Sequence, residues 1–277
     1  RGGGADRPAR RVLLVSLPMV SWADLARADT PVLDRFVRGA AVAGLSTRVD
    51  ARSTPLADGY ATIGAGTRAV GVPETDGDGR GVDEPFGAAT AGETYEQRTG
   101  IAPAGSIVQV GWPLIVDANR RLHYDAEPGA LGSALHRGDR TTAVIGAADG
   151  REPDAAVSVL DAEARTDALV GRLLARTGPR DLVMVVGPAH RPGRVTLTPL
   201  AVRGPGFGPG LLRSPGTRRS GFVQIQDVAP TVLAALGLER PDAMEGRAAT
   251  VGATGGRVAD RLRTIVRADA VAQARDS

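Results

Sequence analysis

Two short runs of uninterrupted apolar residues constrain the fold of this chain more than any other feature. Arg11–Leu17 reads RVLLVSL and Asp181–Val186 reads DLVMVV, and glycine, proline or charged residues flank both. A strand that covers a core on one face alternates apolar and polar residues, whereas a continuous apolar run of this length is typical of a parallel strand buried on both faces. The two runs therefore predict the interior of a sheet that is covered on both sides.

Helix start signals follow the predicted strands. Ser21 precedes a short helical pattern, and Thr30 and Thr54 are each followed by proline, which is the pattern of a helix N-cap with proline at the first helical position. Asp227 precedes a last core helix, which Gly237 ends. Strands that alternate with helices predict an α/β fold, in the form of a three-layer αβα sandwich around a mostly parallel sheet.

The length and composition favour one large domain. The chain has 277 residues, of which 42% are hydrophobic, and this is enough for a single core. We expect residues 1–10 to form a flexible lead-in and residues 11–251 to form the α/β domain. A stretch rich in glycine, proline and acidic residues predicts an excursion at about residues 70–105, and a charged helical tail is expected at residues 252–277.

Charge and cysteine content exclude several classes of function. All 34 basic residues are arginine, but 31 acidic residues balance them to a formal charge of +3, so a nucleic-acid partner is not indicated. Cysteine is absent, which excludes disulfides, thiolate metal sites and a cysteine nucleophile. No apolar run approaches the roughly 18 residues that are needed to span a bilayer.

Three segments of the chain carry motifs that point to one family. The most specific segment reads VQIQDVAPTVLAALG over residues 223–237 and continues with PDAMEGR over residues 241–247. Residues 197–206 read LTPLAVRGPG and residues 30–39 read TPVLDRFVRG. In these segments and their order the chain resembles the alkaline phosphatase superfamily, which includes the sulfatases. The resemblance covers most of the chain and implies an alkaline-phosphatase-like α/β fold. Within the superfamily, the chain looks like a degenerate bacterial member of the actinobacterial type.

The resemblance implies a position for a nucleophile. Enzymes of the superfamily use a Thr, Ser or Cys at a helix N-terminus beside two divalent metals, and Thr54 stands at that place, with Ser53 as the alternative. The plainer interpretation is that Thr54 only caps the helix that follows.

Most of the implied metal ligands are missing. Leu17-Pro18 stands where the family carries an Asp-Gly pair, and the Asp-His-Gly that follows the central strand is replaced by a segment in which only His190 could bind a metal. The segment before the GPG strand, Arg194–Thr198, has neither histidine nor a carboxylate, and Asp149 is a weak candidate elsewhere. Because a two-metal site needs several such ligands, we expect no resident cofactor and no ordinary metal-dependent hydrolysis.

The sequence thus favours a degenerate, non-catalytic phosphatase- or sulfatase-like domain. The resemblance implies an extracytoplasmic place in a membrane-attached protein, with an envelope polymer, an anionic lipid headgroup or a membrane protein as partner. Arg213, Arg218 and Arg219 could bind such an anion, although a solvated loop is the preferred interpretation. Two alternatives stay open: a phosphohydrolase, phosphodiesterase or sulfatase-like transferase that uses Thr54 with Zn, Mn or Mg, and a purely structural domain whose former cleft is filled by Leu17 and Pro18.

Overall fold

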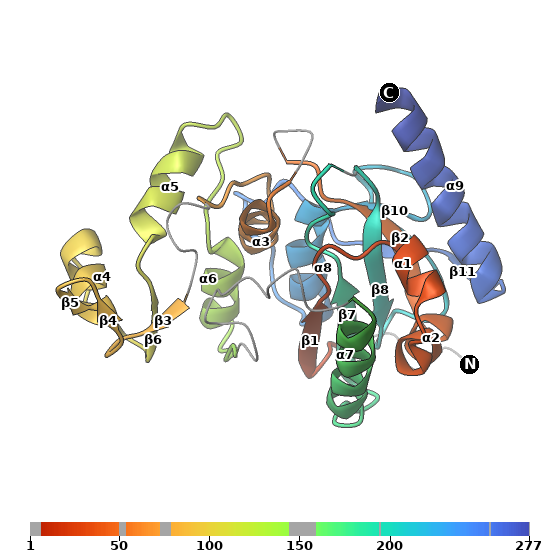
Figure 1. The fold of residues 1–277 in the computed structure, drawn as a ribbon, viewed down its shortest axis with the longest axis horizontal. Helices are drawn as coiled ribbons and strands as arrows, with labels where there is room; N and C mark the ends of the chain where they lie inside the picture. The colour runs from red at the N-terminus through yellow and green to blue at the C-terminus, as the bar shows by residue number, and fades with distance from the viewer. Residues whose placement is uncertain are drawn as a thin grey trace.

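The computed structural model has an α/β fold built on a large mixed sheet (Figure 1). It describes residues 7–49, 54–72, 79–143, 159–193, 195–254 and 256–276. Seven strands form the sheet in the order β1 (Arg11–Ser16), β7 (Asp181–Val186), β8 (Thr198–Arg203), β2 (Ala41–Ser46), β10 (Phe222–Gln224), β9 (Gly210–Arg213) and β11 (Thr250–Thr254).

The strand directions make the sheet a mixed one, so the expectation of a mostly parallel sheet is not confirmed. β8 is antiparallel to both of its neighbours, β7 and β2, and β11 is antiparallel to β9, whereas β1 pairs in parallel with β7 and β2 with β10. The segment between β7 and β8 spans residues 187–197 and contains no helix of the described chain. Antiparallel neighbours can be joined by such a link, while parallel ones need a longer crossover.

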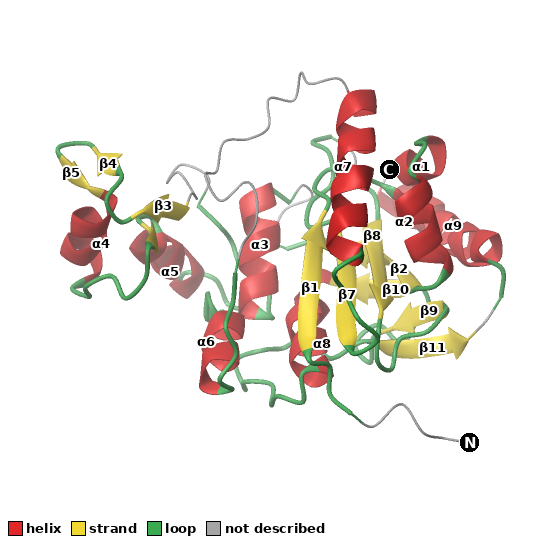
Figure 2. Ribbon diagram, turned by 90° about the horizontal axis from the view of Figure 1, so that it is seen from below, coloured by secondary structure: helices red, strands yellow, loops and turns green. Residues whose placement is uncertain are grey.

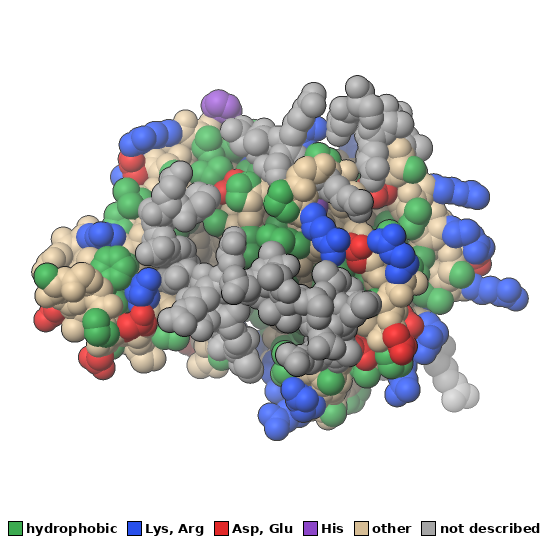
Figure 3. Space-filling view, in the orientation of Figure 1, with side chains coloured by type: hydrophobic (Ala, Val, Ile, Leu, Met, Phe, Trp, Pro, Cys, Tyr) green, Lys and Arg blue, Asp and Glu red, His purple; other side chains and the backbone are tan. Residues whose placement is uncertain are grey.

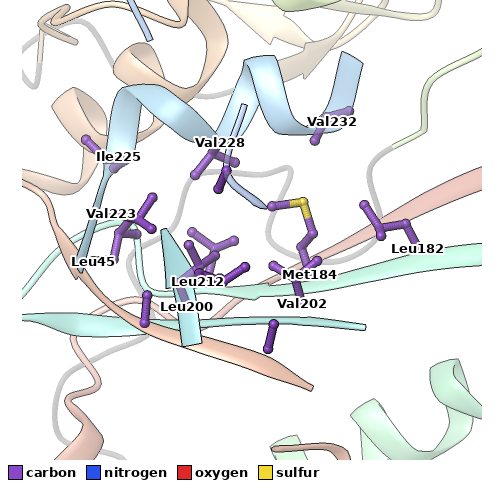
Figure 4. Close-up of a cluster of buried hydrophobic side chains, with 14 of the residues drawn as sticks. Leu45, Leu182, Met184, Leu200, Val202, Leu212, Val223, Ile225, Val228 and Val232 are labelled. Carbon is purple, nitrogen blue, oxygen red and sulfur yellow. The ribbon is translucent and has the colours of Figure 1, made fainter. Parts of the chain in front are cut away.

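Helices cover both faces of this sheet (Figure 2). Along β7, Val183 and Val185 point to one face, and Leu182, Met184 and Val186 point to the other. The first, called here the α2 face, packs against α1 (Trp22–Arg27), α2 (Pro31–Arg38), α7 (Val159–Leu174) and α9 (Val258–Asp276). The second, called here the α8 face, packs against α3 (Leu56–Ala65), α6 (Ala130–Arg137) and α8 (Val228–Ala235), and Figure 4 shows its central side chains.

The charged helical tail expected at residues 252–277 contains α9, and this helix packs on the sheet. Ile265 of α9 is 1% exposed and packs on the α2 face. Arg261 is also buried, and its guanidinium donates to the carbonyl oxygens of Arg38 and Ala40, at 3.0 and 2.5 Å. Burial lowers the pKa of Arg261. These two buried residues anchor α9 to the sheet, and Val258 and Leu262 of the same helix pack beside them.

The excursion expected at residues 70–105 is a small folded lobe that extends to Arg120, and it lies at one end of the molecule (Figure 1). Ala91, Val108 and Val110 form its own buried cluster. The lobe consists of β3 (Gly79–Gly81), β4 (Pro85–Phe86), β5 (Ala89–Thr90), α4 (Ala91–Thr99), β6 (Ile107–Gln109) and α5 (Trp112–Arg120).

Over the described ranges, no helix combines the length and the apolar character that a membrane crossing requires.

Candidate functional site

The carboxyl ends of β1, β2 and β7 lie at the same edge of the sheet, where open α/β sheets generally bind their ligands. The segments that follow β1 and β7 are held together by backbone hydrogen bonds. The amide of Leu17 donates to the carbonyl oxygen of Val186 at 2.8 Å, and the amide of Met19 donates to that of Ala189 at 2.8 Å. The segments in which the sequence predicts site residues after β1 and β7 therefore meet at this edge.

An apolar side chain occupies the place where the family resemblance implies a metal-binding carboxylate. Leu17 is 6% exposed and packs in the cluster of the α2 face with Trp22 and Phe36. The Trp22 indole donates to the carbonyl oxygen of Ala43 at 2.9 Å, which fixes α1 against β2. Leu17, which directly follows β1, is thus part of the core of the α2 face.

Thr54 lies at the same edge, but its hydroxyl is buried and already bonded. The side chain is 3% exposed, and its Oγ1 donates to the carbonyl oxygen of Thr47 at 2.7 Å. The expectation that Thr54 caps the next helix is wrong, because α3 begins at Leu56 and its N-cap residue is Pro55, which has no side-chain cap. Thr54 instead ties the entry to α3 back to the segment that leaves β2. Ser53 lies outside the described residues.

His190 is buried beside a small cavity at the end of β7. It is 5% exposed, and its Nδ1 lies 3.1 Å from the carbonyl oxygen of Arg191. The cavity has a volume of about 20 Å³, which is room for a single water molecule. Its lining consists of Met19, Val20, Ser21, Asp24, His190, Arg191 and Thr196.

Asp24 brings a carboxylate to this cavity. It accepts hydrogen bonds from the amide and the hydroxyl of Ser21, at 3.0 and 2.7 Å, and from Arg27 at 2.8 Å. Burial tends to raise the pKa of Asp24, but these hydrogen bonds and the nearby charge of Arg191 outweigh it, so the pKa is lowered. Asp24 is therefore ionised at neutral pH, and it is engaged in capping α1.

Within the described ranges, no three His, Cys, Asp or Glu side chains gather closely enough to hold a metal ion. The cavity beside His190 offers Asp24 as a second potential ligand. Asp149, the other candidate from the sequence, lies outside the described residues.

The arginines proposed to bind an anion share one loop. Arg213 ends β9, and Arg218 and Arg219 lie in the turn that leads to β10. All three side chains are exposed, and they form no ion pair with any described residue. On the face drawn in Figure 3, basic side chains lie singly or in small groups, several of them beside acidic ones.

The segment with the most specific motif forms a structural clamp. The carboxylate of Asp227 is 1% exposed and accepts hydrogen bonds from the amides of Gln224 and Arg247, at 3.1 and 2.8 Å. The Thr231 hydroxyl donates to the carbonyl oxygen of Asp227 and accepts from the amide of Ala249. Asp227 stands at the N-cap of α8 but makes no side-chain bond to that helix, contrary to the expectation that it caps it. The motif therefore joins α8 to the chain that leads into β11.

Comparisons with known proteins do not assign this chain to a family. No protein-family model matches it, and no curated protein matches its sequence. Among solved structures it is similar to Ps i-CgsB, with a TM-score of 0.38 and 12% identity, over 87% of this chain and 75% of that one. Values as low as these leave both the family and the function open.

Two features of this edge escaped the sequence reasoning. The role of Asp24 had a local signal, because Ser21 and Asp24 have the spacing of a capping box, and the structure forms that box. The second feature is the hydrogen bond of 2.8 Å between the Ser16 hydroxyl at the end of β1 and Tyr60 of α3. No local pattern joins residues 44 positions apart.

Proposed function

We propose that this chain is a degenerate phosphatase- or sulfatase-like domain that binds a ligand or a partner and does not hydrolyse an ester. The observation that carries the proposal is the hydroxyl of Thr54. A nucleophile has to present its oxygen to the substrate, and its proton has to pass to a base or be displaced by a metal. In this chain the buried hydroxyl donates a hydrogen bond to the carbonyl oxygen of Thr47, which is a structural role.

The surroundings of Thr54 also favour this proposal. Leu17 adds apolar volume to the core at the end of β1, and the Asp24 carboxylate is engaged by Ser21 and Arg27. A side chain that is already bonded or packed contributes to rigidity, and it would have to release its present contacts before it could bind a metal.

We further propose that the helices on the two faces of the mixed sheet form an alkaline-phosphatase-like three-layer sandwich. Residues 223–247 support this proposal by their resemblance to that superfamily. On the same ground, we propose that the full-length protein is attached to a membrane with this domain outside the cytoplasm. Its partner would then be an envelope polymer, an anionic lipid headgroup or a membrane protein, and Arg213, Arg218 and Arg219 form the exposed loop that could contact an anion.

Replacing Thr54 tests the proposal. Thr54→Val keeps the shape of the side chain but removes the donor to Thr47, so we expect the free energy of unfolding to fall by about 1–2 kcal/mol, because the buried carbonyl loses its hydrogen bond. Thr54→Ser keeps the donor and should lose less. Urea unfolding of the three proteins measures both effects.

Turnover assays complete the test. The parent and Thr54→Val are incubated with a phosphodiester and a sulfate ester, each with added Zn²⁺, Mn²⁺ or Mg²⁺. We expect no metal-stimulated turnover that depends on Thr54. Metal-stimulated turnover in the parent that is lost in Thr54→Val and retained in Thr54→Ser would overturn the proposal and establish the enzyme alternative.

A further inference from the structure

A second, larger cavity lies at the opposite edge of the sheet from Thr54 and His190. Its volume is about 460 Å³, which is in the range of pockets that hold small organic molecules. Three turns form its walls: the link between α7 and β7, the end of α2, and the glycine-rich loop after β8. The lining residues that bear on its chemistry are Gly178, Asp181, Val183, Arg203, Phe207 and Gly208.

Arg203 supplies a guanidinium to this cavity. It is the last residue of β8, opposite Val183 of β7, and its Cζ lies 4.8 Å from the centre of the Phe36 ring. Its side chain is only partly exposed and makes no hydrogen bond or ion pair with any described residue. A guanidinium carries five donors. None of the Arg203 nitrogens is both buried and without a partner, so water reaches these donors and an anionic ligand could replace that water.

Asp181 supplies a carboxylate to the lining of the cavity, and this carboxylate is already bonded to groups other than Arg203. Its Oδ2 accepts hydrogen bonds from Arg11 at 2.6 Å and from the amide of Gly178 at 2.9 Å, and its Oδ1 lies 3.7 Å from Nε of Arg10. Two arginines thus balance one carboxylate. Together with Arg203, this corner of the molecule carries a positive excess.

We propose that this cavity binds a small anionic molecule whose phosphate, sulfate or carboxylate group pairs with the guanidinium of Arg203. The planar fork of arginine matches such oxyanions, and stacking on Phe36 holds it in place. Val183 and Phe207 offer apolar contacts to the rest of the ligand. The site goes beyond the proposed function, and because it lies at the other edge of the sheet, either proposal can fail without the other.

Gly208 allows a test that leaves the core untouched. A Cβ at Gly208 would meet no atom within 4 Å, so both Gly208→Asp and Gly208→Asn should fold. We expect Gly208→Asp to weaken the binding of glycerol 3-phosphate by about tenfold, because it places a negative charge at the cavity. Gly208→Asn has the same shape without the charge and should bind like the parent. Isothermal titration calorimetry measures the affinities.

A second pair of variants addresses Arg203 itself. Arg203→Met should abolish binding, and Arg219→Met, which removes an exposed arginine of the β9–β10 loop, should not change it. Vesicles with and without phosphatidylglycerol form a separate arm, in which binding with the same pattern of variants would identify a lipid headgroup as the source of the anion. Equal affinity of the parent and Gly208→Asp, or no binding to either probe, would refute the site even if Arg203→Met fails to fold.

Discussion

Replacing Asp227 with alanine should lower the free energy of unfolding by about 3 kcal/mol, because two buried backbone amides lose their acceptor. The carboxylate joins the amide of Gln224 to that of Arg247, and through them the start of α8 to the chain before β11. Urea unfolding measures the loss. Glu239→Ala, on the partly exposed segment after α8, is a control that should change stability by less than about 0.5 kcal/mol. If the Asp227→Ala protein were as stable as this control, the carboxylate of Asp227 could not join α8 to the chain before β11 as described.

The dependence on pH separates the charge of Asp227 from its hydrogen bonds. Burial raises the pKa of Asp227 above its ordinary value of 3.8, against the effect of hydrogen bonds from Arg247, Ser214 and Gln224. Between these two pKa values the folded chain keeps the proton and the unfolded chain does not, so stability falls as pH rises through this window. The stability of the parent relative to Asp227→Asn should therefore decrease from about pH 4 upward and then level off. If this relative stability instead increased with pH, the hydrogen bonds would outweigh burial in their effect on the pKa of Asp227.

The local elements of the fold could be predicted, because each has a local cause. Asp181–Val186 is a strand with the predicted bounds, and the predicted Arg11–Leu17 ends one residue earlier, at Ser16. Both runs are apolar on both faces, so burial on either side of the sheet stabilises them as strands. The direction of β8 could not be predicted in the same way, because it depends on which strands β8 lies between.

Thr54 and Arg261 illustrate why the site and the tail were harder to predict. A threonine before proline satisfies the pattern of an N-cap, but a distant carbonyl, that of Thr47, accepts its hydrogen bond. Arg261 looks like a surface charge in the sequence, yet three backbone carbonyls around it make a buried position tolerable. In both cases the partner is a backbone oxygen, which the sequence of side chains does not reveal. The contacts of such polar residues are set by tertiary structure.

The second large effect on stability is expected at Gly59 of α3, which lies against the loop that follows β7. A Cβ at this position would stand 2.1 Å from the carbonyl oxygen of Pro188 and 2.9 Å from its carbon, and neither backbone atom can move without the loop that leads to His190. We expect Gly59→Ala to lower the free energy of unfolding by about 3 kcal/mol, since overpacking against backbone forces α3 or this loop to shift. Thermal unfolding measures the loss.

Gly64→Ala on the same helix is the matched control. Its Cβ would lie 3.9 Å from the amide nitrogen of Gly129, which is an ordinary contact, so alanine should stabilise α3 by about 0.5–1 kcal/mol through its higher helix propensity. The two substitutions are chemically identical. Their expected effects on the free energy of unfolding have opposite signs because the two Cβ atoms meet different neighbours. If Gly59→Ala matched Gly64→Ala, α3 could not be packed against the Pro188 loop as described. The placement of Thr54 relative to His190 would then have to be revised as well, because Thr54 leads into α3 and His190 follows Pro188 in this loop.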